Sequence, residues 1–241
     1  MAVKGEKMLV RLDKLLADNG IGTRSEVKKI IKNGQVTVDG KVVKGSELKV
    51  DASASKVAVS GKEISAKLES WYMLNKPAGT VSANEDGRNK TVFDLLDVPE
   101  KKRLFCVGRL DIDTEGLLLI TDNGEVSHSL LSPKKHVSKK YYTEYSGELC
   151  RGAEKMVAEG LQVDEELKCL PAKLEITEDG KAYLTIAEGK FHQVKRMMER
   201  LGGKVTYLKR LEFGPLVLDE NLKPGEYREL SEKEIEALKG R

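Results

Sequence analysis

The part of the chain best suited to chemistry is residues 108–121, with the sequence GRLDIDTEGLLLIT. Asp111 stands shortly before an apolar run, Leu117 to Ile120, that is typical of a buried strand. A carboxylate at the mouth of a strand is well placed for nucleophilic or acid–base chemistry. An arginine, Arg109, precedes this aspartate by two residues.

Other chemistries receive less support from the sequence. Asp111 and Asp113 could hold Mg²⁺ between them, but the positive charge of Arg109 would compete with a cation. The three histidines lack metal-ligand spacing, and no serine or cysteine stands in a nucleophile elbow. A glycosidase would need a paired second carboxylate that the sequence does not clearly offer. We therefore expect no metal, no cofactor and no hydrolytic triad, and we interpret His192 as structural.

Two further segments carry polar side chains on regular elements. Residues 138–145, SKKYYTEY, alternate like a strand and place Tyr141, Thr143 and Tyr145 on one face. Residues 193–201 repeat apolar residues at helical spacing, which predicts an amphipathic helix. Lys195 belongs to this helix, and its spacing alone makes it an exposed partner of Glu199.

A strand that ends in a sharp turn is predicted for residues 71–79, WYMLNKPAG. Trp71 to Leu74 form a strand-like run. Pro77 cannot donate a hydrogen bond to a neighbouring strand, and Gly79 permits a tight turn. The chain must therefore leave the sheet close to Lys76.

The positive charge of the chain is concentrated in its first 60 residues. They hold twelve Lys or Arg and seven Asp or Glu, a net charge of +5, whereas the remaining residues have a net charge of −2. Residues 12–34 predict two helices, the second begun by a capping box of Thr23 and Glu26, and residues 35–43 predict a hairpin. A compact basic module is typical of a polyanion-binding domain, and a merely solvated lysine face is the alternative.

Length and composition indicate a folded globular protein. The 241 residues could form one large domain or two smaller ones, and 39% hydrophobic residues suffice for a core. Three cysteines without zinc spacing indicate a reducing compartment. The longest aliphatic run is far shorter than the ~20 residues of a membrane span. We expect a soluble cytoplasmic protein that does not bind membranes.

The basic module resembles the S4 RNA-binding domain over nearly its full length. The resemblance rests on residues 11–43, RLDKLLADNGIGTRSEVKKIIKNGQVTVDGKVV. It implies that this module binds RNA through its basic side chains. The candidate contacts are Arg11, Arg24, Lys28, Lys29 and Lys32.

The rest of the chain resembles the pseudouridine synthases, enzymes that isomerise uridine within RNA. Four motifs occur in the family's order: LNKPAG, GRLDIDTEGLLLIT, SKKYY and EGKFHQVKRM. With the S4 segment, the resemblance covers nearly all of residues 8–235. Residues 120–142 and the segment LDENLKPGEYRELSEKEIEAL are most similar to the RsuA type, which modifies one uridine of 16S rRNA.

The resemblance implies a role for each motif residue. Asp111 would be the nucleophile, Tyr141 would lie against the target base, and Lys195 would pair with Asp111, with Arg196 as the alternative partner. A charge partner is needed because a buried, unpaired carboxylate tends to take up a proton. Three residues of this part are candidate RNA contacts. Arg109 would fill the gap left by a flipped uridine or hold a phosphate, and the other two are Lys76 and Arg196.

The resemblance also implies an α+β fold in two domains. A small S4 (αL-like) domain would occupy residues 1–65, and a catalytic domain with a long, mainly antiparallel mixed β-sheet flanked by helices would occupy residues 66–241. The implied protein is a monomer that isomerises uridine in bacterial 16S rRNA or in a small-subunit assembly intermediate. A synthase acting on 23S rRNA and a non-catalytic rRNA-binding assembly factor remain the alternatives.

Overall fold

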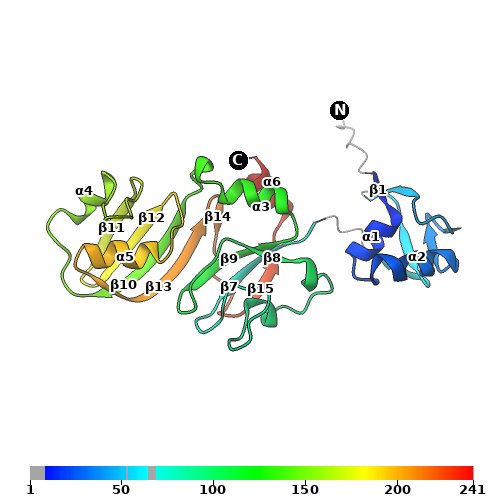
Figure 1. Ribbon diagram of the computed structural model, residues 1–241, viewed down its shortest axis with the longest axis horizontal. Coiled ribbons are helices and arrows are strands. Elements are labelled where there is room, and N and C mark those ends of the chain that lie inside the picture. The colour runs from blue at the N-terminus through cyan, green and yellow to red at the C-terminus, as the bar shows by residue number, and fades with distance from the viewer. Residues whose placement is uncertain (1–8, 53, 65–68, 241) are drawn as a thin grey trace. The chain divides into compact units, whose positions relative to one another are not determined.

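The computed structural model describes residues 9–52, 54–64 and 69–240 (Figure 1). The chain divides into two compact units. The first comprises residues 1–70 together with Asp97–Leu104, and the second comprises Trp71–Leu96 and Phe105–Arg241. The predicted domain boundary between residues 65 and 66 lies outside the described residues.

The first unit pairs two helices with short antiparallel strands. Strands β3, β2, β5 and β6 form one sheet in that order, and β1 pairs with β4. The bounds of its elements are β1 Leu9–Arg11, α1 Leu12–Asp18, α2 Arg24–Lys32, β2 Val36–Val38, β3 Lys41–Val43, β4 Lys49–Asp51, β5 Val57–Val59, β6 Lys62–Ile64 and the 3₁₀ turn Lys101–Arg103.

Local signals explain why these helices form where they do. Thr23 and Glu26 form the predicted capping box, in which the Thr23 backbone N–H donates to the Glu26 carboxylate at 2.7 Å. α1 and α2 bury Leu12, Leu16, Val27 and other apolar residues in a common core with the sheet. The predicted helix–helix–hairpin arrangement is confirmed, because β2 and β3 pair across the turn at Asp39.

The second unit is built on a long sheet that is mixed but mostly antiparallel. Its strands follow the order β11-β12-β10-β13-β9-β7-β15, with β14 on β13 and β8 on β9. The bounds of its strands are β7 Trp71–Lys76, β8 Phe105–Val107, β9 Glu115–Thr121, β10 Lys139–Ser146, β11 Lys173–Glu178, β12 Lys181–Ile186, β13 Lys204–Phe213, β14 Leu216–Val217 and β15 Tyr227–Glu229. The expected α+β fold is confirmed.

Helices flank this sheet. They are α3 Gly124–Leu131, α4 Ala153–Ala158, α5 Gln193–Arg200 and α6 Glu232–Lys239, with 3₁₀ turns at Val92–Leu95 and Pro133–Lys135. α5 packs on β13, and α3 packs on α6 (Figure 1). α5 buries Val194, Met197 and Met198, as its amphipathic pattern predicts.

The two halves of the sheet meet where β9 runs parallel to β13. The register pairs Glu115 with Lys209 and Gly116 with Arg210. A Cβ on Gly116 would lie 2.2 Å from the Arg210 carbonyl oxygen, and Gly116 has a φ of +99°. Only glycine therefore allows the strands to approach at this point. The loop that carries Asp111 enters β9 directly before it.

Candidate active site

Asp111 lies in the loop between β8 and β9, and neighbouring backbone groups hold this loop on both sides. The Ser82 hydroxyl donates to the Leu110 carbonyl at 2.9 Å and accepts from the Leu110 N–H at 3.1 Å. The Gly79 N–H donates to the Ile112 carbonyl at 2.7 Å. The turn after β7 thus fixes the loop, while the Asp111 side chain remains about one-third exposed.

Lys76 holds the same loop through hydrogen bonds to its backbone carbonyls. Its side chain is fully buried, and its ammonium donates to the carbonyls of Thr114 at 2.8 Å, Pro77 at 3.1 Å and Ile112 at 3.4 Å. Burial lowers the pKa of Lys76 to about 8, although the carboxylates of Asp113 and Asp111 oppose this shift. The prediction that Lys76 contacts RNA is wrong, because the side chain has no exposed surface.

Lys195 joins the loop to α5 through two carboxylates. Its ammonium lies 3.1 Å from Asp111 Oδ2 and 2.6 Å from Asp113 Oδ1. Burial opposes the charge of Lys195, but hydrogen bonds to Asp113 and Asp111 outweigh it and raise its pKa. Burial likewise opposes ionisation of Asp113, and the Lys195 ammonium outweighs it and lowers the pKa of that carboxyl. Spacing alone suggested Glu199 as partner; the structure brings Lys195 to Asp111.

His192 belongs to the site rather than to the core. It has a left-handed backbone conformation, with φ of +49°, at the residue that caps the N-terminus of α5. Its Nε2 lies 3.6 Å from Asp111 Oδ1, and its side chain is 41% exposed. The interpretation of His192 as a structural residue stays a prediction, but the structure places its side chain at the site, beside Asp111. The sequence offered little sign of this, because the contact depends on an unusual backbone conformation.

Tyr141 forms one wall of the site. It is buried on β10 together with Thr143 and Tyr145, as the alternating pattern predicts. Tyr141 and Asp111 line a common pocket of about 80 Å³, which also includes Arg109 and Lys195. A neighbouring cavity of about 900 Å³ is lined by Arg109, Asp111, Asp113 and Lys195 as well.

Two buried cations next to Tyr141 were not predicted. Lys139 and Arg210 line a third pocket, of about 240 Å³, with Tyr141 and Arg109. Burial and the positive charge of Arg210 lower the pKa of Lys139 to about 8. Arg210 donates from Nε to the Leu117 carbonyl at 2.7 Å. Strand alternation places Lys139 in phase with Tyr141, so this signal was present in the sequence.

Arg196 is directed away from Asp111. Its guanidinium forms an ion pair with Asp164. It therefore does not replace Lys195 as the partner of Asp111, and an RNA contact would have to compete with Asp164. Arg109, in contrast, is exposed and lines all three pockets.

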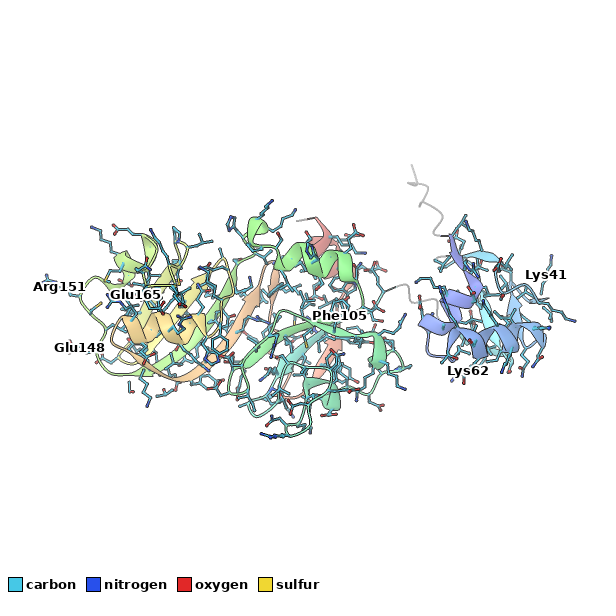
Figure 2. All side chains as sticks on the ribbon, in the orientation of Figure 1. Lys41, Lys62, Phe105, Glu148, Arg151 and Glu165 are labelled. Carbon is cyan, nitrogen blue, oxygen red and sulfur yellow. The ribbon has the colours of Figure 1, made fainter. Side chains whose placement is uncertain are left out.

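The basic residues of the first unit fall into two groups. Arg11 is held by two carboxylates, since its Nη2 lies 2.8 Å from Asp13 Oδ2 and 3.2 Å from Glu47 Oε1. Four others are exposed on α2: Arg24, Lys28, Lys29 and Lys32. The labelled Lys41 and Lys62 also extend from this unit, on strands β3 and β6 (Figure 2).

The described part of the chain contains neither a metal-binding cluster nor a membrane-spanning helix. Within it, no three His, Cys, Asp or Glu side chains gather in a way that could hold a metal ion. Asp111 and Asp113 both contact an ammonium group instead. No helix in the same part has the length and apolar character needed to cross a bilayer.

Two protein-family models match this chain, and each match falls mainly within one unit. Residues 70–200 match the family model described as RNA pseudouridylate synthase, and residues 10–54 match the S4 domain. The second match falls on the unit that carries α1 and α2. The first match spans β7, the Asp111 loop and α5.

Curated relatives align with almost the entire chain. An uncharacterized RNA pseudouridine synthase, YtzG, of Bacillus subtilis is 46% identical over 95% of this chain and 98% of its own length. Ribosomal small subunit pseudouridine synthase A of Vibrio parahaemolyticus is 43% identical, and that of Haemophilus influenzae is 41% identical, each over 95% of this chain and 99% of its own length. A solved structure described as a pseudouridylate synthase is 39% identical, with a TM-score of 0.68, over 95% of this chain and 99% of its own.

Proposed function

Because the chain belongs to the RNA pseudouridylate synthase family and carries an S4 domain, we propose that it isomerises a specific uridine in small-subunit (16S) rRNA. The chain is an isomerase by family membership. Its substrate is inferred from relatives named ribosomal small subunit pseudouridine synthase A, which align over nearly their full length. We infer that it acts in the cytoplasm of a bacterium, on free rRNA or on an assembling subunit. We also propose that it acts as a monomer, because Asp111, Tyr141 and Lys195 come together within a single chain.

The reaction begins with exposure of the target uridine. A uridine within folded RNA is stacked, and extruding it costs a few kcal/mol. Arg109 is exposed beside the pocket, so its guanidinium can fill the gap in the stack or hold a phosphate. The flipped base would then enter the pocket and lie against the ring of Tyr141.

Asp111 would attack the flipped nucleotide as a nucleophile, and the covalent bond that it forms breaks again before the product leaves, which regenerates the free carboxylate. The bond between N1 of uracil and C1′ of the ribose breaks, the base turns, and C5 bonds to C1′ in its place. The hydrogen on C5 leaves as a proton and N1 gains one, so the isomerisation is balanced without an oxidant or reductant. A covalent step divides one difficult reaction into two easier ones.

The observation that carries this proposal is the contact of Lys195 with Asp111 at the wall of the Tyr141 pocket. The ammonium at 3.1 Å places a positive charge directly beside the Asp111 carboxylate, and a carboxylate is nucleophilic only in its ionised form. A non-catalytic assembly factor would not need a carboxylate, an ammonium and a tyrosine at one pocket.

Mapping pseudouridines in both rRNAs tests the proposal. Carbodiimide-induced stops of reverse transcription would be compared between wild-type cells and cells that lack the gene. We expect one stop to disappear from 16S rRNA and to return with a plasmid copy. Loss of a stop from 23S rRNA alone would assign the enzyme to the large subunit, and no change in either rRNA would favour the assembly factor.

A further inference from the structure

An exposed aromatic ring lies beside the active site. Phe191, two residues before α5 begins, is 76% exposed, the highest value among the large hydrophobic residues of the described chain. It lines the cavity of about 900 Å³ together with Asp111, Asp113 and Lys195. A single exposed apolar residue needs no explanation. An exposed ring in the wall of the cavity beside Asp111, however, is typical of a surface that binds a ligand.

The ring is held in place by its neighbour. Phe191 and His192 stack with centroids 3.8 Å apart and planes inclined by 17°. His192 is fixed in turn by its position at the start of α5 and its contact with Asp111. One face of Phe191 is thus occupied by the imidazole. A rigid ring loses little conformational entropy when a second planar group covers its other face.

The surrounding charge indicates which planar group that is. Arg109 and Lys190 line the same cavity. Lys190 forms an ion pair with Glu188 at 3.2 Å, whereas no acidic side chain in the described part of the chain pairs with Arg109. Cations beside a rigid ring fit a nucleotide, whose phosphate they attract and whose base stacks on the ring. A hydrophobic side chain of a partner protein would not need these cations.

We propose that Phe191 is a stacking platform for an unpaired base of the RNA next to the flipped uridine. The proposal rests on the proposed function, because it assumes that RNA occupies the cavity. Stacking holds the strand open beside the target, while Asp111 and Tyr141 act on the flipped nucleotide. Phe191 is then a residue that positions the RNA and takes no part in the bond changes.

A tryptophan reporter tests the contact directly. The native chain has one tryptophan, Trp71, which is 2% exposed and gives a constant background. F191W would be titrated with a single-stranded RNA of about twelve nucleotides and with the same strand paired to its complement. We expect strong quenching by the single strand and weak quenching by the duplex. V217W is the matched control, because Val217 on β14 is also exposed, at 61%.

Absence of quenching in F191W, or equal quenching in V217W, would overturn the proposal. Turnover supplies a second measurement on a transcript of the small-subunit rRNA. F191L keeps an apolar side chain but loses the ring, and we expect its half-saturating RNA concentration to rise about tenfold, as loss of one stacked base predicts. F191W should stay close to wild type. Equal behaviour of the two variants would indicate mere apolar packing.

The two proposals can fail separately. Quenching of F191W does not require turnover, so it would survive if the wild-type enzyme left small-subunit rRNA unmodified. Conversely, modification of this rRNA by the wild-type enzyme without quenching of F191W would remove only the stacking role.

Discussion

Asp111 and Asp113 share the ammonium of Lys195, yet their surroundings differ. Asp111 lines the pocket that includes Tyr141, and its side chain is 31% exposed, whereas that of Asp113 is 66% exposed. Lys195 thus sits between a carboxylate at the pocket and one at its rim. The shared ammonium lowers the pKa of Asp113 against the effect of burial, and it places a positive charge beside Asp111 as well.

Substitution of Lys195 tests this arrangement at the scale of one residue. We expect K195M to slow single-turnover pseudouridine formation about a hundredfold, or ~2.7 kcal/mol, because Asp111 loses its charge partner. K195R should preserve much of the rate, since the positive charge remains. R196M is the control, because Arg196 pairs with Asp164. A large loss of rate confined to R196M would show that Arg196, and not Lys195, is the residue that supports Asp111.

The position of the Asp111 loop depends on the junction of β9 and β13. The two strands meet in parallel over only two residue pairs, directly after the Asp111 loop. The Tyr207 hydroxyl, on β13, donates to the Glu115 carboxylate, on β9, at 2.8 Å. Arg210 adds a hydrogen bond from β13 to β9. These bonds join β9, which follows the Asp111 loop, to β13. β13 in turn pairs with β10, the strand that carries Tyr141.

A methyl group at Gly116 should disrupt this junction. G116A places a Cβ 2.2 Å from a backbone oxygen and forces a left-handed conformation on a residue with a side chain. We expect a loss in the free energy of unfolding of at least ~2 kcal/mol, together with lower activity. Urea unfolding of G116A and of the wild type measures the loss in the free energy of unfolding. G124A is the control, because no atom lies within 4 Å of a Cβ there. Equal stability of the two variants would contradict the account.

The local elements of this fold could be predicted, and the long-range contacts could not. The capping box at Thr23 and the alternation of Tyr141 with its neighbours depend on residues close in sequence. The burial of Lys76 depends on carbonyls about 36 residues further along the chain, which no local pattern reveals. Lys195 and Asp111 are 84 positions apart, so only the family resemblance indicated their pairing.

We propose that the two units contribute differently to RNA binding. The second unit holds the pocket, and the first presents Lys28, Lys29 and Lys32 on the exposed side of α2. Phosphate contacts through such lysines supply affinity that is independent of sequence and weakens with salt. The S4 match covers this helix.

The salt dependence of RNA binding tests this division. We expect K28Q combined with K29Q to weaken binding to small-subunit rRNA and to reduce the slope of log K against log salt by about 1.5. K41Q combined with K62Q removes the same charge from the same unit and should change the slope less (Figure 2). Equal slopes for the two double variants would show that α2 is only a solvated surface.

We propose that Asp111 is the nucleophile of the isomerisation. The most direct measurement is tritium release from small-subunit rRNA labelled at C5 of uridine, because isomerisation expels that hydrogen. We expect D111N to release none above background while its RNA affinity stays within about tenfold of wild type, or ~1.4 kcal/mol. D113N, which alters the other carboxylate on Lys195, should retain activity within about tenfold. Turnover by D111N near the wild-type rate would contradict the account.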